Sequence, residues 1–301
     1  MDATAERGHA PAADLTVGSL VREVAERLAG ESAIEESAEE ARELVAAVFD
    51  APRFWPALHA GTTVERTWRE RALLAAAMRR RGAPLAYCVG RAQFRRFTLD
   101  VDERVLIPRP ETEQLVDVAL SAAGPEPGGV AVDVGTGSGA IALALASEGH
   151  FERVIATDIS LDALAVARGN ARLLADTLRT PVEFRQGSLL APLDEARPRL
   201  VVSNPPYVAS SEAAALPRSV RDWEPPVALV SGKDGMQATA RLLRQAAARL
   251  APRGVLALEV DSRRAGAVSR LAEADARFTD VSVLPDLAGR ERFVVARRKE
   301  D

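Results

Sequence analysis

The sequence predicts an α/β protein in which a small helical domain precedes an open, mostly parallel sheet. Two observations predict this fold class. Short apolar runs typical of buried strands alternate with helical stretches from residue 130 to residue 260. Upstream, residues 15–82 show helical periodicity. An alternation of strands and helices favours a parallel sheet, so we expect the chain to place its main ligand site in the second part.

Composition and charge exclude several classes of protein. With 301 residues, 47% hydrophobic and 27% charged, the chain has the content of one large globular domain or two. No apolar run approaches the ~18 residues of a membrane helix, and no basic leader is evident, so we expect a cytoplasmic protein without membrane contact. A net charge of −4 argues against stable nucleic-acid binding. We also expect a monomer.

Cysteine and histidine usage argues against a disulfide or a metal. Cys88 is the single cysteine, which rules out an internal disulfide and fits a reducing compartment. The three histidines are scattered along the chain and form no metal-ligand pattern with each other or with Cys88. We therefore expect no metal.

The N-terminal part is expected to be a disordered tail followed by a helical domain. Residues 1–14 are rich in alanine and lack an apolar period. Four helical pieces follow within 15–83, where apolar residues recur at three- to four-residue spacing. We expect Thr63 to cap the last of them, with Trp68 and Leu74 facing inward. Since this domain offers no catalytic constellation, we expect it to dock a partner or to close over the active site.

The stretch 84–109 is predicted to link the two domains. The alternating aromatic and apolar pattern of 93–101 predicts a β-hairpin. Pro110 then suits the first turn of a helix, with Glu111 favourably placed near its positive end. Prolines on both sides of Arg109 indicate a fixed loop that can wall a pocket. Arg109 and Glu111 are therefore candidate substrate-binding residues.

A glycine-rich turn follows the first strand of the predicted catalytic domain, residues 110–301. Glycine lets the backbone turn tightly and approach a ligand, while N–H groups at a helix start favour polar or anionic groups. Gly135, Gly137 and Ala140 also satisfy the G-x-G-x-x-A fingerprint of nicotinamide dinucleotide sites, so spacing alone leaves the cofactor open. The predicted cofactor-binding residues of this turn are Gly135, Thr136, Gly137, Ser138 and Gly139.

Asp158 ends the next predicted strand. A carboxylate at this point can hold both ribose hydroxyls of a nucleoside cofactor. The alternative is an ordinary helix N-cap for the helix that begins at Leu161. The remaining strands, which bring the expected number in the sheet to seven, are at 181–186, 200–202, 254–260, 281–283 and 292–296.

The stretch Asn204-Pro205-Pro206-Tyr207 follows directly after the strand at 200–202. The two prolines cannot continue a strand, and each pushes its predecessor into an extended conformation, so the chain leaves the sheet in one fixed shape. The Asn204 amide, two backbone carbonyls and the Tyr207 ring can converge on a planar NH2 group. The alternative is a plain Pro-Pro loop. Since ligands of open α/β sheets bind beyond the carboxyl ends of the strands, we expect Asn204 on the same rim as Asp158.

These motifs resemble a known enzyme family. The order of the glycine turn, Asp158 and Asn204-Pro205-Pro206-Tyr207 resembles class I adenosylmethionine-dependent methyltransferases that modify planar nitrogens. The chain is more closely similar to bacterial release factor glutamine methyltransferases. That similarity rests on Pro84 to Tyr87, Val105 to Glu113, Val220 to Pro225, Asp234 to Met236 and Gly289 to Arg292, and it extends from about Leu15 to Ala296.

The resemblance implies a Rossmann-like seven-stranded methyltransferase sheet. It further implies S-adenosyl-L-methionine as cofactor and, as substrate, the glutamine of the Gly-Gly-Gln loop of peptide chain release factors. Asn204, Pro205 and Tyr207 would be catalytic and Pro206 would contact substrate. The cofactor would contact the glycine turn, Asp158, Ile159, Ser188, Leu189 and Asn204. The family usually has an acid after the third strand, where this chain has Gly187-Ser188-Leu189, so adenine recognition is expected to differ.

Three other functions remain open at this point. A ribosomal-protein glutamine methyltransferase would share the fold and the Asn204 stretch. A nucleic-acid amino-methyltransferase uses a similar tetrapeptide on a flipped base, but it would normally bring a recognition domain or a basic cleft. A non-catalytic adenosylmethionine-binding or chaperone-like module on the ribosome would keep the glycine turn without needing Asn204.

Overall fold

The structure is a computed structural model that describes residues 15–29, 34–194 and 197–300. The chain divides into two compact units, Met1–Val89 and Gly90–Asp301. The boundaries expected from the sequence, after residues 83 and 109, are finer than this division and stay a prediction. The tail expected at 1–14 lies outside the described residues.

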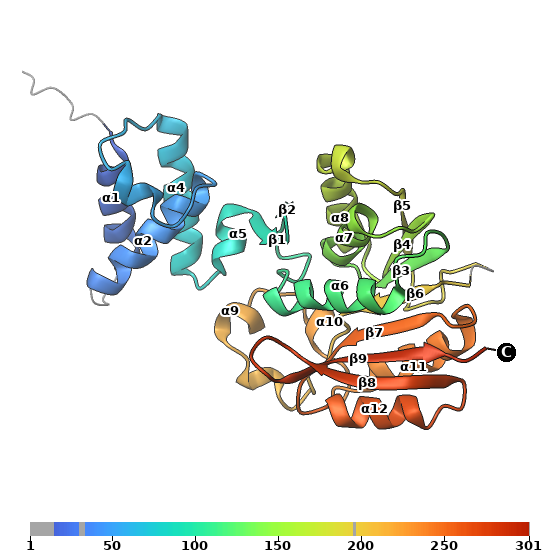
Figure 1. Ribbon diagram of the computed structural model, residues 1–301. Coiled ribbons are helices and arrows are strands. Elements are labelled where there is room, and N and C mark those ends of the chain that lie inside the picture. The colour runs from blue at the N-terminus through green and yellow to red at the C-terminus, as the bar shows by residue number, and fades with distance from the viewer. Residues whose placement is uncertain (1–14, 30–33, 195–196, 301) are drawn as a thin grey trace, which may run out of the picture. The chain divides into compact units, whose positions relative to one another are not determined.

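The N-terminal unit is helical, as expected, and is drawn in blue to cyan in Figure 1. Its apolar side chains recur on one face of each long helix, and together they form a separate core around Leu20, Leu44 and Ala76. Phe49 stacks between Trp55 and Trp68, with ring centroids 5.1 and 4.7 Å away. The helices are α1 (Val17–Ala29), α2 (Ile34–Val48), α3 (Trp55–Leu58), α4 (Arg66–Arg80) and α5 (Leu85–Val89).

Two sequence-based expectations for α4 are wrong. Thr63 does not cap it, because Thr63 pairs with Thr16 in an isolated β-bridge and Glu65 occupies the N-cap position. Leu74 does not face inward and is 66% exposed. The buried face of α4 consists of small residues instead, Ala72, Ala75 and Ala76, which lets the helix approach its neighbours closely.

The second unit contains a hairpin and a seven-stranded sheet. Strands β1 (Arg91–Phe94) and β2 (Phe97–Asp100) form the predicted hairpin. Helix α6 (Pro110–Ala123) begins at the predicted proline. The sheet strands are β3 (Val130–Val134), β4 (Arg153–Asp158), β5 (Val182–Gln186), β6 (Leu200–Ser203), β7 (Val255–Glu259), β8 (Phe278–Pro285) and β9 (Glu291–Arg298).

The sheet has the order β5-β4-β3-β6-β7-β9-β8. Its first five strands are parallel, and β9 runs antiparallel to both β7 and β8. The remaining helices are α7 (Ala140–Glu148), α8 (Leu161–Leu173), α9 (Arg218–Arg221), α10 (Pro226–Leu229), α11 (Gln237–Arg249) and α12 (Ala265–Glu273), with short 3-10 turns at Ala175–Thr177 and Ala213–Ala215. The predicted fold class is confirmed.

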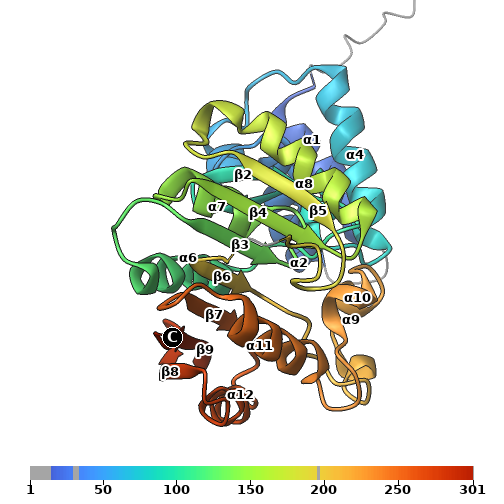
Figure 2. The ribbon, with the colours of Figure 1, turned by 90° about the vertical axis from the view of Figure 1, so that its right-hand side faces the viewer.

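Helices cover both faces of the sheet (Figure 2). Helices α6 and α7 pack on one face, whereas α11 and α12 pack on the other. Strands β3 and β6 are buried at every residue, which explains why the sequence shows them as continuous apolar runs. Over the described ranges, no helix combines the length and apolar character needed to cross a membrane. The carboxyl ends of the parallel strands meet at one edge, where the site is built.

Candidate active site

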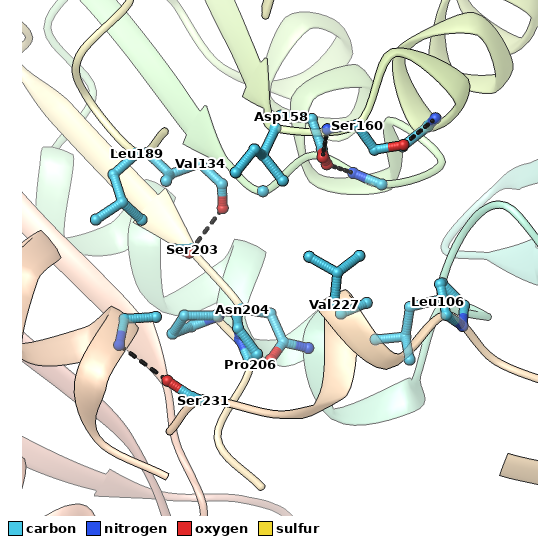
Figure 3. Close-up of a pocket in the computed structure, with 18 of the residues that line it drawn as sticks. Leu106, Val134, Asp158, Ser160, Leu189, Ser203, Asn204, Pro206, Val227 and Ser231 are labelled. Carbon is cyan, nitrogen blue, oxygen red and sulfur yellow. Dashed lines mark hydrogen bonds between the residues drawn. The ribbon is translucent and has the colours of Figure 1, made fainter. Parts of the chain in front are cut away.

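A cavity of about 340 Å³ lies at the carboxyl ends of β3, β4 and β6, which is within the size range of small-molecule sites. Figure 3 shows Asp158 on one side of it and Asn204, Pro206 and Val227 on the facing side. The structure therefore brings the glycine turn, Asp158 and the Asn204 stretch to one cavity. Of the residues predicted from the sequence, its lining contains Gly135, Gly137, Asp158, Ile159, Ser188, Leu189, Asn204, Pro205 and Pro206.

The glycine turn forms one wall of the cavity. Gly135 and Gly137 have φ values of +74° and +53°, in the left-handed region that other residues rarely adopt. A Cβ atom added to either would meet no heavy atom within 4 Å, so it would extend into open space beside the wall. The absence of these two side chains thus leaves backbone facing the cavity, which fits a bound group that approaches the main chain closely.

Asp158 is held by backbone donors beside this turn. Its carboxylate accepts the N–H groups of Gly137 at 3.0 Å and Ser160 at 2.9 Å (Figure 3). Burial raises the pKa of this carboxyl group, while the backbone hydrogen bonds oppose that shift. The alternative interpretation as a helix N-cap is wrong, because the Ser160 hydroxyl accepts from Ala163 N and caps α8.

The other predicted cofactor residues divide into two groups. Ile159 lines the cavity and is 57% exposed, so its apolar side chain is available to cover a planar ring. Ser188 and Leu189 lie on the same wall, as predicted. Thr136, Ser138 and Gly139 do not line the cavity, and the Thr136 hydroxyl instead donates to buried Asp133 at 2.6 Å. An acidic group beside an exposed apolar surface and bare backbone suits a nucleoside-bearing cofactor.

The facing wall begins where β6 ends. The Ser203 hydroxyl donates to Val134 O at 2.7 Å and ties the end of β6 to β3. The Asn204 amide nitrogen donates to the Thr112 hydroxyl at 3.1 Å. Within the described part of the chain, neither the Asn204 side-chain oxygen nor the Pro205 carbonyl accepts a hydrogen bond. The wall therefore presents two oxygen acceptors with unused capacity.

Tyr207 lies behind this wall and does not line the cavity. Burial raises the pKa of its hydroxyl to about 12, with a further contribution from Glu259, so it stays protonated at neutral pH. Its carbonyl approaches Gly235 closely, since a Cβ atom there would come within 2.3 Å of Tyr207 O. Gly235 has a φ of +77° as well, which explains why glycine is required at this point of the sequence.

Arg109 and Glu111 do not line the cavity either. Arg109 pairs with Glu224, whose side chain is only 1% exposed. Burial raises the pKa of Glu224, and the Arg109 guanidinium opposes that shift. This pair ties the loop before α6 to the loop before α10. Two residues of α10, Val227 and Ala228, line the cavity. The structure thus gives Arg109 a role in holding the cavity wall, and its predicted contact with substrate stays a prediction.

Sequence reasoning missed Thr112 and Glu259. Thr112 lies in the first turn of α6, and Glu259 is the last residue of β7. The Thr112 hydroxyl donates to Glu259 Oε2 at 2.7 Å while it accepts from Asn204. Both side chains are buried. The signal that could have found them is a glutamate at the end of an otherwise apolar strand, since a buried carboxylate is costly unless it is paired.

The chain is similar to known methyltransferases in sequence and in fold. Residues 112–218 match the family model of the methyltransferase small domain. The chain is 42% identical to the release factor glutamine methyltransferase of Cereibacter sphaeroides, over 94% of this chain and 99% of that protein. It is 40% identical to the protein of the same name from Moorella thermoacetica, over 73% of this chain and 77% of that protein.

The chain belongs to the release factor glutamine methyltransferase family. This confirms the resemblance, and it makes the protein a methyltransferase rather than a nicotinamide-dependent enzyme or a binding module. Among solved structures, the hMettl16 catalytic domain in complex with MAT2A 3'UTR hairpin 6 matches with a TM-score of 0.53 and 16% identity, covering 78% of this chain and 82% of that one. That likeness supports the fold alone.

Proposed function

We propose that this methyltransferase transfers a methyl group from S-adenosyl-L-methionine to the side-chain amide nitrogen of a glutamine in peptide chain release factors. The names of its relatives supply the substrate class. The glutamine would be the one in the Gly-Gly-Gln loop of the release factor. The observation that carries the proposal is the Asn204 stretch, which presents two unused oxygen acceptors to a cavity suited to a nucleoside cofactor.

The cofactor would occupy the side of the cavity formed by the glycine turn. Backbone at Gly135 and Gly137 would hold the methionine portion, and the Asp158 carboxylate would accept hydrogen bonds from the ribose hydroxyls. Ile159 and Leu189 would cover the adenine, and Ser188 would accept a hydrogen bond from its amino group. Bound there, adenosylmethionine supplies an electrophilic methyl group on a positively charged sulfur.

The facing wall would prepare the glutamine amide. An amide nitrogen is a poor nucleophile because its lone pair is delocalised into the carbonyl group. Acceptance of one amide hydrogen by Asn204 Oδ1 and the other by the Pro205 carbonyl would draw electron density toward nitrogen and fix its orientation. Held in this way, the amide nitrogen would take the methyl group as its bond to sulfur breaks, and one amide proton would leave to water. The expected packing of Tyr207 on the glutamine amide stays a prediction, because Tyr207 does not line the cavity.

The alternatives are less well supported by the chain. A ribosomal-protein glutamine methyltransferase would use the same wall, but the relatives described above carry the release factor name. A nucleic-acid enzyme is disfavoured by the net charge of −4. We further propose that the protein acts as a monomer in the cytoplasm, where its substrate would function.

One experiment separates these functions. The full chain is incubated with methyl-labelled adenosylmethionine and, in separate reactions, purified release factor, ribosomes or DNA. We expect label only on the release factor, at a glutamine located by peptide mass spectrometry. Label on a ribosomal protein or on DNA would replace the proposed substrate, and no label on any acceptor would contradict the proposed function.

A further inference from the structure

We infer that Thr112 and Glu259 are positioning residues that fix which end of the Asn204 amide faces the substrate. This inference deepens the proposed function and rests on it. It depends on a hydrogen-bonded chain that runs from Asn204 through Thr112 to Glu259, away from the cavity. Neither Thr112 nor Glu259 lines the cavity, so both would act through Asn204.

The order of donors along this chain follows from the chemistry of its last member. Above about pH 7, Glu259 is ionised and its carboxylate has no hydrogen to donate, so the Thr112 hydroxyl donates to Glu259 Oε2, at 2.7 Å. A hydroxyl has one hydrogen, and once it is used the oxygen can only accept. The partner at 3.1 Å must therefore be the NH2 group of Asn204. The Asn204 oxygen is thereby directed away from Thr112.

This order matters because the two ends of an amide are nearly identical in shape and opposite in function. An oxygen facing the cavity accepts a hydrogen from the glutamine amide. If the NH2 group of Asn204 faced the cavity instead, it would place a donor against the NH2 donor of the glutamine. No hydrogen bond would then orient the lone pair of the glutamine nitrogen. Asn204 alone does not determine which end faces the substrate, whereas a chain that ends on a carboxylate does.

The burial of Glu259 supports a role beyond packing. Its side chain is 1% exposed at the end of an apolar strand, where an apolar residue would be less costly. Burial raises the pKa of Glu259 to about 7, opposed by the Thr112 hydrogen bond and Arg292, with Glu111 raising it and Arg109 lowering it. Glu259 in turn contributes to the raised pKa of Tyr207. The Thr112 hydrogen bond and the nearby arginines thus limit the shift, so that Glu259 is ionised above about pH 7.

Three variants of the full chain test the inference, with Thr180→Val as a matched control. Thr112→Val keeps the shape of the side chain but removes the hydroxyl, whereas Thr112→Ser keeps the hydroxyl. Glu259→Gln keeps the shape and adds an NH2 group that can donate to Thr112 and reverse the chain. Thr180 is also buried, and its hydroxyl makes one hydrogen bond, to Phe151 O, far along the chain from the site.

Turnover is measured with saturating adenosylmethionine and purified release factor. We expect kcat to fall about 10- to 100-fold in Thr112→Val and Glu259→Gln. The KM for release factor and the affinity for adenosylmethionine should change by less than about threefold. Thr112→Ser should recover most of the rate, and Thr180→Val should lose thermal stability as Thr112→Val does while it keeps the wild-type kcat. Equal rate losses in both Val variants, or full activity of Thr112→Val, would overturn the inference.

A second measurement does not depend on the methyl acceptor. In the NMR spectrum of the wild-type protein, one side-chain NH2 hydrogen of Asn204 should show the downfield shift of a hydrogen-bonded amide, and Thr112→Val should lose it. If the wild-type protein shows this shift but does not methylate release factor, the proposed function is contradicted and the chain of hydrogen bonds is still supported. An unchanged Asn204 signal in Thr112→Val would contradict the chain itself.

Discussion

The two walls of the cavity are built in different ways. We call the side with Gly135, Gly137 and Asp158 the cofactor wall, and the side with Asn204, Pro205 and Pro206 the acceptor wall. The glycine turn of the cofactor wall is held by local contacts, because buried Asp133 accepts hydrogen bonds from Thr136 and Ala142, three and nine residues further along the chain. The acceptor wall is assembled from distant segments, because Glu259 lies 147 residues from Thr112, its hydrogen-bond partner. Both walls rest on a buried carboxyl group whose pKa burial raises to about 7. Under the proposed function, the difference means that backbone shape would hold the cofactor, whereas side-chain hydrogen bonds would orient the methyl acceptor.

The largest expected effect is on the acceptor wall. Asn204→Ala removes the side-chain oxygen that we propose accepts an amide hydrogen, so the rate of methyl transfer should fall about 10²- to 10³-fold. Calorimetry with adenosylmethionine should give an affinity within about threefold of wild type, since the other wall is unchanged. Wild-type methylation by this variant, with cofactor binding intact, would remove Asn204 from the mechanism.

The buried carboxyl group behind each wall should affect stability as a function of pH. The folded protein keeps the proton of Glu259 up to about pH 7, whereas the unfolded chain releases it near the ordinary glutamate pKa of 4.5. Stability contributed by this group therefore falls as pH rises from about 4.5 to 7 and is constant above that. The wild-type free energy of unfolding, relative to Glu259→Gln, should drop by about 2 kcal/mol between pH 5 and pH 8.

Urea unfolding at the two pH values measures this difference. Asp133→Asn should remove a similar pH-dependent contribution from the cofactor wall, because burial raises the pKa of Asp133 in the same direction. If the difference in the free energy of unfolding between wild type and Glu259→Gln did not change with pH, Glu259 would be ionised throughout this range.

A smaller effect is expected from the backbone of the cofactor wall. Gly137→Ala places a methyl group at a φ of +53°, beside the cavity, and should weaken adenosylmethionine binding about 10-fold. Gly289→Ala is the matched control, because Gly289 also has a positive φ, of +77°, and open space around it, but does not line the cavity. Equal losses of affinity in both variants would mean that backbone strain alone, and not the position of Gly137 at the cavity, causes the weaker binding.

The smallest effect concerns adenine recognition. Ser188→Asp replaces a neutral acceptor with a charged one on the cofactor wall, and a charge-assisted hydrogen bond is roughly twice as strong. We expect affinity for adenosylmethionine to increase by about fivefold, measured by calorimetry. An unchanged affinity would mean that serine serves as well as the acid usual in this family.

The same difference between the walls explains what could be predicted from the sequence. The glycine turn, Asp158 and Asn204 to Pro206 are contiguous motifs next to strong strand signals, and the structure brings them together at one cavity. Thr112 lies within the recognised stretch Val105 to Glu113, but no local pattern pairs it with Glu259, and only the packing of α6 beside β7 brings the two into contact. Glu224 was part of a recognised motif, yet its ion pair with Arg109 depends on a separation of 115 residues that no local pattern encodes.

Within the helices, the errors have a different cause. Leu74 has the apolar character of a core residue, but α4 presents its alanines inward and leaves Leu74 exposed. Thr63 has the chemistry of an N-cap, but a β-bridge to Thr16 holds it before the helix starts. In both cases tertiary contacts override a local preference.

The most direct test of the division between the two walls is single-turnover methylation of release factor at saturating adenosylmethionine, with Gly137→Ala and Asn204→Ala measured side by side. We expect Gly137→Ala to recover nearly the wild-type rate once its weaker binding is overcome by concentration. Asn204→Ala should stay about 10²- to 10³-fold slower at every cofactor concentration. If the rate of Asn204→Ala recovered at high cofactor concentration, or if Gly137→Ala stayed slow, the assignment of cofactor binding to one wall and of acceptor orientation to the other would be contradicted.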